Sequence, residues 1–458
     1  MTTPHAGFDS SWLAAQKVAE EAAALGQDVV LARDLLGRSS LLIDDIQQKL
    51  PSDSPQLNKL RVQFAEATRP FTGVEPVQTA HSMFAPELFF DAPELTEVKP
   101  RADGVGRLCT LERTVVGTDW LQRDDDSATG TPGSRRNRRV ALYGFKGGVG
   151  RSTATAVLAR HLADLGRCVL VVDLDLESPG VSNLLSDEAG RPQHGIVDHL
   201  VEAAVSNADS LELVGRASLL NYHGNGEVFL APACGLPLAG QPYNYLSKLN
   251  RIYTDLPATG ESTSPRPFAV RLEQAVAACE DQVERLARRP DHVLLDSRAG
   301  IHDIAAVTLT RLSGLALLFA VDNPSTWEGY RMLLSEWQRR PDRARELRER
   351  IRIVGAMFHS AGDTERLGAL RRHAYDLFMD TLYNLPDENE DEEEPFYSPD
   401  GDVDDAPYAA IPILFGNDLV GLDPLRSRRW PELPFVEAAY SKFTTAVERL
   451  LPEPHEDA

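Results

Sequence analysis

A glycine-rich run, Phe145-Lys146-Gly147-Gly148-Val149-Gly150-Arg151-Ser152-Thr153, contains the side chains best suited to hold a phosphate group. An apolar stretch at 140–143 precedes it and predicts a buried strand, and an Ala- and Leu-rich stretch at 154–165 follows and predicts a helix. Such a turn directs backbone N–H groups and the positive end of a helix toward an anion. Its glycines let the chain curl around the anion without Cβ clashes. We therefore expect a phosphate site made by Gly147, Gly148, Val149, Gly150, Arg151, Ser152 (also a Mg²⁺ ligand) and Thr153.

Carboxylates end two further apolar stretches of the sequence. The stretch that begins at Cys168 runs into Asp173-Leu174-Asp175, and a later one runs into Asp296, with Gly300 four residues on. A carboxylate at the end of a hydrophobic strand is the group that a Mg²⁺–nucleotide site needs opposite the phosphate loop. We therefore expect Asp296 to bind Mg²⁺ and the N–H of Gly300 to approach the terminal phosphate. A glycine turn that serves packing alone is the alternative, but three pieces in this order favour a nucleotide site.

The glycine-rich run resembles the deviant phosphate-binding motif of the ParA/MinD family of P-loop ATPases, Lys-Gly-Gly-x-Gly-Lys-Ser/Thr-Thr. Asp173-Leu174-Asp175 resembles the aspartate motif of that family's second strand, and Asp296 with Gly300 resembles its Walker B and switch region. The resemblance covers about residues 139–450. It implies an α/β fold with a doubly wound, mostly parallel sheet of the P-loop NTPase type, and ATP with Mg²⁺ as ligands.

The same resemblance implies roles for individual side chains. Lys146 matches the signature lysine, which reaches across a face-to-face dimer to the partner's nucleotide, so a nucleotide-dependent homodimer is expected. Asp175 matches the aspartate that positions the attacking water; a carboxylate that only caps its loop is the alternative. Asp173 is expected to assist Mg²⁺ or to hold the loop. Glu177 is a further candidate that has no counterpart in the family.

One position departs from the family pattern. Arg151 stands where the family has its second lysine, and since the chain has 7 Lys and 40 Arg, a general preference for arginine is one explanation. Guanidinium is planar and prefers a bidentate grip, whereas ammonium is a compact charge that can follow the terminal phosphate. We therefore expect nucleotide binding to survive and turnover to be slow or conditional. Arg298 is either a second cation near the phosphates or a surface residue of the switch.

Composition limits the classes of function. The chain has 458 residues, enough for two domains, and no apolar run approaches the roughly 18 residues of a membrane-spanning helix. It begins without the features of a signal peptide, and its four cysteines lack metal-ligand spacing, so the cytoplasm is expected and a membrane partner is not. The net charge of −22 argues against indiscriminate nucleic-acid binding.

The N-terminal residues 1–122 contain no recognisable motif. Apolar residues at helical spacing predict helices over about 9–68, with Leu31, Leu35, Leu42 and Ile46 on one face, and 95–120 has strand character. We expect a mainly helical α+β accessory domain that contacts an unidentified protein partner. Residues 123–139 are expected to form a linker, because three aspartates, a Gly/Thr/Pro-rich run and the basic cluster 135–139 bury little apolar surface. That cluster either contacts an anionic group or is a solvated flank.

Beyond the linker, strands and helices alternate, which predicts a parallel sheet wound on both faces. The P-loop NTPase domain is expected to span 140–451, with a disordered acidic insertion at 387–405 and an acidic tail at 452–458. The predicted strands are 140–144, 168–173, 227–231, 291–296, 315–321, 351–358 and 409–414. The predicted helices are 152–165, 195–205, 268–288, 302–312, 325–340, 364–379 and 434–451.

The sequence indicates the nucleotide base and any macromolecular partner less clearly than it indicates the phosphate site. Ile411-Pro412 resembles the family's loop against the base, which makes Pro412 a nucleotide contact, but the strand at 351–358 lacks the family's asparagine. Adenine therefore rests on the resemblance, and guanine stays open. Residues 331–352 hold eight arginines against four acids. They form either a DNA-binding surface or, as we favour, a solvated helix face with i,i+4 pairs.

Two functions follow from these observations. The first is a nucleotide-dependent switch that resembles ParA/MinD ATPases, hydrolyses ATP slowly and controls a partner or cargo. The alternative is a regulatory module of a multi-protein bacterial signalling or conflict system that binds nucleotide without hydrolysing it. A DNA-binding adaptor that uses the arginine-rich stretch is a third class, and its affinity would fall steeply with salt.

Overall fold

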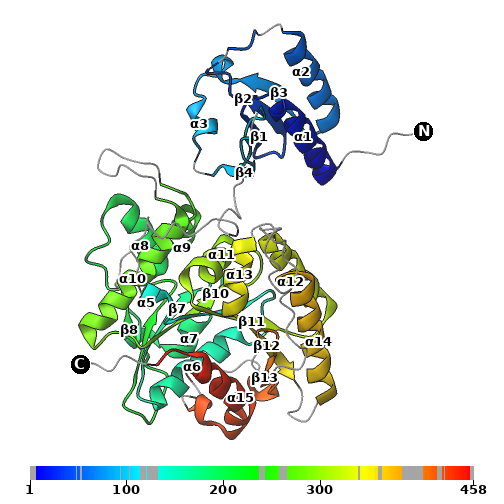
Figure 1. The fold of residues 1–458 in the computed structure, drawn as a ribbon. Coiled ribbons are helices and arrows are strands. Elements are labelled where there is room, and N and C mark those ends of the chain that lie inside the picture. The colour runs from blue at the N-terminus through cyan, green and yellow to red at the C-terminus, as the bar shows by residue number, and fades with distance from the viewer. Residues whose placement is uncertain are drawn as a thin grey trace. The chain divides into compact units, whose positions relative to one another are not determined.

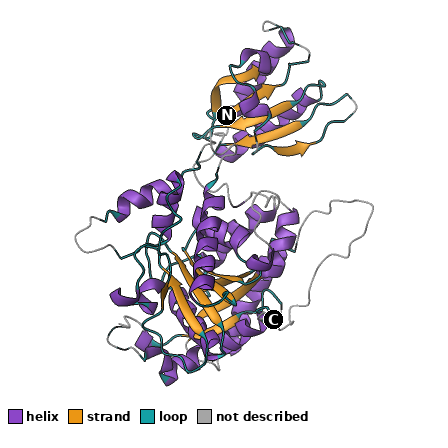
Figure 2. Cartoon of the chain, turned by 90° about the vertical axis from the view of Figure 1, so that its left-hand side faces the viewer, coloured by secondary structure: helices purple, strands orange, loops and turns teal. Residues whose placement is uncertain are grey.

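The computed structural model divides the chain into two compact units, Met1–Val116 and Gly117–Ala458. It describes residues 7–453 except 48, 52–53, 93, 103, 114–119, 121–132, 237–242, 257–265, 339–340, 359–363, 384–405, 420–424, 426 and 428. The expected insertion at 387–405, most of the tail and most of the linker therefore lie outside the described residues. Each unit has its own sheet and helices (Figures 1 and 2).

The first unit is a five-stranded mixed sheet with strand order β3-β2-β1-β5-β4. Its elements are α1 (Phe8–Ala23), β1 (Val29–Arg33), β2 (Ser39–Ile43), α2 (Pro55–Thr68), β3 (Thr72–Thr79), a 3₁₀ turn (Ala80–Ser82), α3 (Glu87–Phe90), β4 (Thr96–Lys99) and β5 (Leu108–Glu112). Helices α1 and α2 pack on the sheet through an apolar cluster that includes Val18, Leu31 and Phe64. The unit is thus α+β but more sheet-rich than expected.

The helix expected through Leu31, Leu35, Leu42 and Ile46 is wrong. Residues 29–33 and 39–43 are instead antiparallel strands that pair Leu31 with Leu41. The Asp34 carboxylate accepts hydrogen bonds from the backbone N–H groups of Leu36 and Arg38, and so closes a tight turn between them. A four-residue spacing of leucines fits a strand–turn–strand as well as a helix, and the turn-forming Asp34 and Gly37 decide between the two.

The second unit contains an eight-stranded sheet of order β13-β12-β11-β6-β10-β7-β9-β8, parallel except where β8 meets β9. The strands are β6 (Arg139–Gly144), β7 (Cys168–Leu174), β8 (Gly215–Arg216), β9 (Glu227–Ala231), β10 (His292–Ser297), β11 (Leu315–Ala320), β12 (Ile351–Phe358) and β13 (Ile411–Leu414). The mostly parallel sheet predicted from the alternating pattern is confirmed.

Helices cover both faces of this sheet because alternate strand residues point to opposite sides. Val140 and Leu142 of β6 join the cluster packed by α6, α7 and α15, whereas Ala141 and Tyr143 join the cluster on the other face. The helices are α5 (Gly133–Arg136), α6 (Arg151–Asp164), α7 (Val181–Leu185), α8 (Ile196–Glu202), α9 (Tyr245–Ile252), α10 (Phe268–Leu286), α11 (Asp303–Val307), α12 (Pro324–Gln338), α13 (Pro341–Arg350), α14 (Thr364–Asp380) and α15 (Pro434–Leu450). Among the helices of the described ranges, none is long and apolar enough to cross a bilayer.

The end of the expected linker belongs to the second unit. Arg139, the first residue of β6, is fully buried, and its Nε and Nη2 donate to both oxygens of Glu280 at 2.7 and 3.0 Å. Arg135 pairs with Asp281 at 2.8 Å. These arginines are therefore not a solvated flank, because their bidentate and charge-assisted bonds fasten the start of the sheet to α10.

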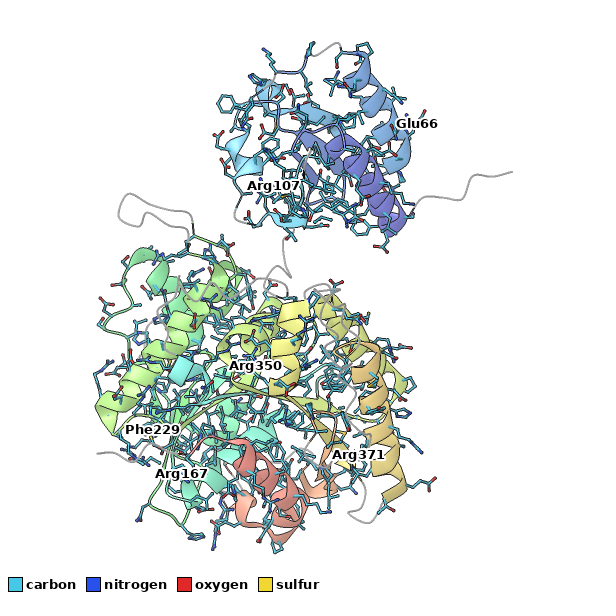
Figure 3. The ribbon with its side chains drawn as sticks, viewed as in Figure 1. Glu66, Arg107, Arg167, Phe229, Arg350 and Arg371 are labelled. Atoms are coloured by element: carbon cyan, nitrogen blue, oxygen red, sulfur yellow. The ribbon has the colours of Figure 1, made fainter. Side chains whose placement is uncertain are left out.

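Several arginines of the 331–352 stretch are also used inside the unit. The Glu346 carboxylate accepts from Arg343 and Arg136 at 2.8 Å, and Arg350, labelled in Figure 3, lies 3.6 Å from it. Burial opposes ionisation of Glu346, but the guanidinium groups around it lower its pKa below the ordinary value. Arg350 also donates to the carbonyl of Ser313 at 2.8 Å. These contacts favour a structural role for this face over a DNA surface.

Candidate nucleotide site

The glycine-rich loop lies between β6 and α6, as predicted. Strand β6 ends at Gly144 and α6 begins at Arg151. Gly148 and Gly150 have φ angles of +76° and +82°, in the left-handed region that residues with a Cβ avoid. Gly150 is the N-cap of α6, so the first N–H groups of the helix open toward the loop. The local geometry is that of an anion-binding helix N-terminus.

A cavity of about 360 Å³ opens beside this loop. One wall is Lys146 with residues 148–153, which is the polar side expected to meet phosphates. The remaining lining residues are largely apolar and come from the end of β12, from the end of β13 and the segment after it, and from α15: Met357, Ile413, Leu414, Phe415, Gly416, Leu419 and Tyr440. One charged and one apolar wall suit a nucleotide, whose phosphates and base differ in the same way.

The sequence predicts only Pro412 as a contact on the apolar side of the cavity. Pro412 pairs with Gly355 in the sheet, and the cavity lining begins one residue later, at Ile413. Tyr440, on the last helix, is buried, and a Cβ added at Gly150 would lie 3.8 Å from its hydroxyl. Only the carboxyl end of the last strand could have pointed to 413–416, since ligands gather at strand carboxyl ends. The sequence holds no signal that would place Tyr440 there.

Sheet order brings the two aspartate-tipped strands to the loop. Strand β10 lies between β6 and β7, and Asp296 stands in register with Asp173 on β7. Gly300 follows with a φ of +80°, but its N–H donates to the Gly144 carbonyl at 3.3 Å. The parallel sheet thus gathers the predicted carboxylates at one edge, while the Gly300 N–H meets the start of the loop.

Arg151 forms a two-carboxylate clasp across this edge. Its Nε donates to Asp296 Oδ1 at 2.8 Å and its Nη2 to Asp175 Oδ2 at 2.7 Å. The Arg151 side chain is 8% exposed and the Asp296 side chain is fully buried. Burial disfavours the charged guanidinium, but the two carboxylates outweigh it and raise the pKa of Arg151 above its ordinary value. Arg151 therefore stays charged and binds the two carboxylates expected to serve the metal and the water.

Ser152 and Asp296 have the donor chemistry of a Mg²⁺ site. The Ser152 hydroxyl donates to Asp296 Oδ2 at 2.7 Å, on the oxygen that Arg151 leaves free. Hydroxyl and carboxylate oxygens are the ligands that Mg²⁺ prefers, with phosphate and water completing its shell. Within the described ranges, no group of three His, Cys, Asp or Glu side chains could hold a metal by itself. The pair fits an ion that arrives together with a nucleotide.

Asp173 is engaged differently. Its Oδ2 accepts from the N–H and the hydroxyl of Ser182 at 3.1 and 2.6 Å, and its Oδ1 from the N–H of Asp175 at 3.2 Å. Of its two expected roles, these contacts favour holding the loop after β7 over binding metal. Burial and the neighbouring Asp296 carboxylate raise the pKa of Asp173 to about 7.

This raised pKa predicts a pH dependence of stability in metal-free buffer. Between the ordinary carboxyl pKa of 3.8 and about 7, the folded chain holds a proton on Asp173 that the unfolded chain lacks. Asp173 should therefore add stability as the pH falls from 7 to 5, by at most about 1.4 kcal/mol per pH unit. Urea unfolding of the wild type and Asp173→Asn at pH 5, 6, 7 and 8 measures it. Asp173→Asn should lack this gain in stability at low pH. If the free energy of unfolding changes with pH equally in the wild type and in Asp173→Asn, Asp173 does not have the raised pKa.

Two further cations lie around the edge. Lys146 is exposed and donates from Nζ to the Ser325 hydroxyl. Arg298 pairs with Glu177 at 2.5 Å, and Glu177 also accepts from the Tyr253 hydroxyl. Arg298 thus connects the segment after β10 to the segment after β7, and Lys146 is not held by the carboxylates. The geometry alone does not give either cation a phosphate contact.

The fold and site define a P-loop-type nucleotide-binding protein. The family model described as "CobQ/CobB/MinD/ParA nucleotide binding domain" matches residues 140–374, and the chain belongs to this family. The antiactivator FleN of Pseudomonas aeruginosa is 27% identical over 241 residues, 53% of this chain and 69% of FleN. The chromosome-partitioning ATPase Soj of Thermus thermophilus is 51% identical over 47 residues, 10% of this chain and 19% of Soj.

Other similarities are partial or remote. An iron-sulfur cluster carrier protein of Methanocaldococcus jannaschii is 31% identical over 93 residues, so the match spans 20% of this chain and only 32% of that relative. Among solved structures, pNOB8 ParA bound to nonspecific DNA is 16% identical with a TM-score of 0.40, covering 69% of this chain and 97% of that one. A chain of the MinC:MinD cell division protein complex of Aquifex aeolicus is 17% identical with a TM-score of 0.38, covering 70% of this chain and 98% of that one.

Proposed function

We propose that this protein is a nucleotide-dependent switch that binds ATP with Mg²⁺, hydrolyses it slowly and thereby controls a partner or cargo in the cytoplasm. The observation that carries the proposal is the Arg151 clasp on Asp296 and Asp175, set between the phosphate loop and the two strand ends. Family membership supports nucleotide binding, and the Arg151 clasp supports slow turnover.

Each residue has a role in this proposal. The α6 N-terminus and the loop bind the phosphates, Ser152 and Asp296 hold Mg²⁺, and Asp175 orients the attacking water. When bound, Mg²⁺ neutralises charge that develops on the phosphate oxygens. While Arg151 Nη2 donates to Asp175 Oδ2 at 2.7 Å, only Oδ1 is left to orient the water, and the nearby guanidinium charge makes the carboxylate a weaker base. Turnover is therefore slow until the clasp opens.

The remaining parts of the proposal concern assembly. Lys146 is exposed and bound only to a serine hydroxyl among the described residues, so it is available to reach a second copy's nucleotide in a homodimer. The first unit is a separately packed α+β body, and we assign the partner-binding role to it. Gel filtration with and without ATP tests the dimer, which should form only with nucleotide.

The non-hydrolysing module remains the second candidate, since the Arg151 guanidinium draws on the charge of the Asp175 carboxylate and makes it a weaker base toward water. Calorimetry with ATP and GTP, with and without Mg²⁺, followed by phosphate-release assays, separates the two. Binding with steady release supports the switch, and tight binding without release supports the module. If neither nucleotide binds, both are wrong.

A further inference from the structure

Three carboxylates meet at the edge beside the phosphate loop. Asp173 and Asp296 are fully buried on neighbouring strands, and Asp175 is 14% exposed. A nucleotide triphosphate would bring further negative charge to this edge. Repulsion of that kind is strong where water is excluded, so a cation is required close by.

Arg151 supplies that cation from within the chain. It contacts Asp296 and Asp175 directly, through Nε and Nη2, and it also lines the cavity beside the loop. Its third nitrogen, Nη1, makes no hydrogen bond to the residues that the structure describes. A guanidinium can bind two carboxylates and still donate from Nη1 to a phosphate oxygen. A lysine ammonium at the same position is one nitrogen and cannot span the three groups in this way.

The same contact weakens the metal site at Ser152 and Asp296 without removing its ligands. Asp296 is shared: Arg151 binds its Oδ1 and Ser152 its Oδ2. A divalent cation bound at Ser152 and Asp296 would therefore lie close to a guanidinium that is already positive. The guanidinium and the ion compete for one carboxylate, so each weakens the other.

We propose that Arg151 is a fixed internal cation that lets the site bind nucleotide phosphates without Mg²⁺ and makes nucleotide affinity nearly independent of the metal. The proposal rests on the proposed nucleotide binding and adds the residue that sets its metal dependence. A structural arginine that only joins two loops would not change the response of affinity to Mg²⁺.

The test is the ratio of the ATP dissociation constants in EDTA and in Mg²⁺, measured by calorimetry on the full chain. We expect a ratio of about threefold or less for the wild type and about tenfold or more for Arg151→Lys, since one bound ligand commonly changes the affinity for another by about 5–150-fold. Arg311→Lys is the matched control: Arg311 Nε also binds a buried carboxylate, Glu273, at 2.8 Å, but it does not line the cavity. Its ratio should equal the wild-type ratio.

A second variant keeps the proposal testable if Arg151→Lys does not fold. Asp175→Asn removes one of the two charges that hold the guanidinium, so affinity for ATP in EDTA should rise about threefold or more with Arg151 in place. A wild-type ratio of tenfold or more, or an Arg151→Lys ratio equal to the wild type, would overturn the inference while leaving nucleotide binding intact. Absence of ATP and GTP binding in both buffers would instead refute the proposed function, and this inference with it.

Discussion

Replacing Arg151 by methionine should destabilise the second unit by about 3–5 kcal/mol in metal-free buffer. The change removes the partner of Asp296, which is fully buried, and leaves a carboxylate whose charge is no longer compensated. Methionine keeps most of the apolar volume, so the loss comes mainly from the charge. Burying a charge without a partner is among the few single changes that reach this size.

Urea unfolding followed by tryptophan fluorescence measures the effect, because four of the five tryptophans, at 120, 327, 337 and 430, belong to the second unit. Arg331→Met is the control: the pair of Arg331 with Asp380 is 48% and 57% exposed, so its loss should cost less than about 1 kcal/mol. The double change Arg151→Met with Asp296→Asn should recover part of the loss. If Arg151→Met costs no more than the control, the clasp does not stabilise the unit.

Asp175→Asn should reduce phosphate release by about 100-fold or more, the usual contribution of a group that takes a proton from the attacking water. The amide keeps the shape of the side chain and can still accept from Arg151, so ATP binding should persist. Arg151→Lys should change turnover in the opposite direction, because a lysine would leave Asp175 free to meet water. Both effects follow from the bond between Arg151 Nη2 and Asp175 Oδ2.

A phosphate-release assay with saturating ATP and Mg²⁺, with binding measured separately, tests this prediction. Asp380→Asn serves as the control, since the Asp380 carboxylate is exposed and, within the described part of the chain, pairs with Arg331 alone. Equal release by the wild type and Asp175→Asn would assign the chemistry to another group. No release by the wild type, together with tight binding, would favour the non-hydrolysing module.

Local sequence patterns, namely apolar runs and glycine-rich turns, were enough to predict the main elements of the second unit. The run 145–153 lies between a strand and a helix, and the strands predicted at 227–231 and 351–358 have those bounds in the structure. Buried parallel strands are continuous apolar runs, and glycines at positive φ mark their turn, so both are visible in the sequence.

Predictions from local patterns were wrong where the same residue pattern fits two different structures. Leu31 and Leu42 fit a helix face, yet they lie on paired strands, and the arginines at 135 and 139 looked like a linker flank, yet they bind carboxylates on α10. The carboxylates that bind these arginines are distant in the chain, so residues near the arginines do not indicate the contacts.

The sequence by itself determined the class of protein: a glycine turn, two aspartate-tipped strands and an alternating α/β pattern specify a nucleotide-binding sheet, because each is a local consequence of residue type. Only the tertiary structure decided what Arg151 does and what closes the cavity. Strand order sets Asp175 and Asp296 within reach of one guanidinium, and α15 brings Tyr440 to the loop from almost 300 residues away. Such contacts arise from how strands and helices pack, which residue spacing does not encode.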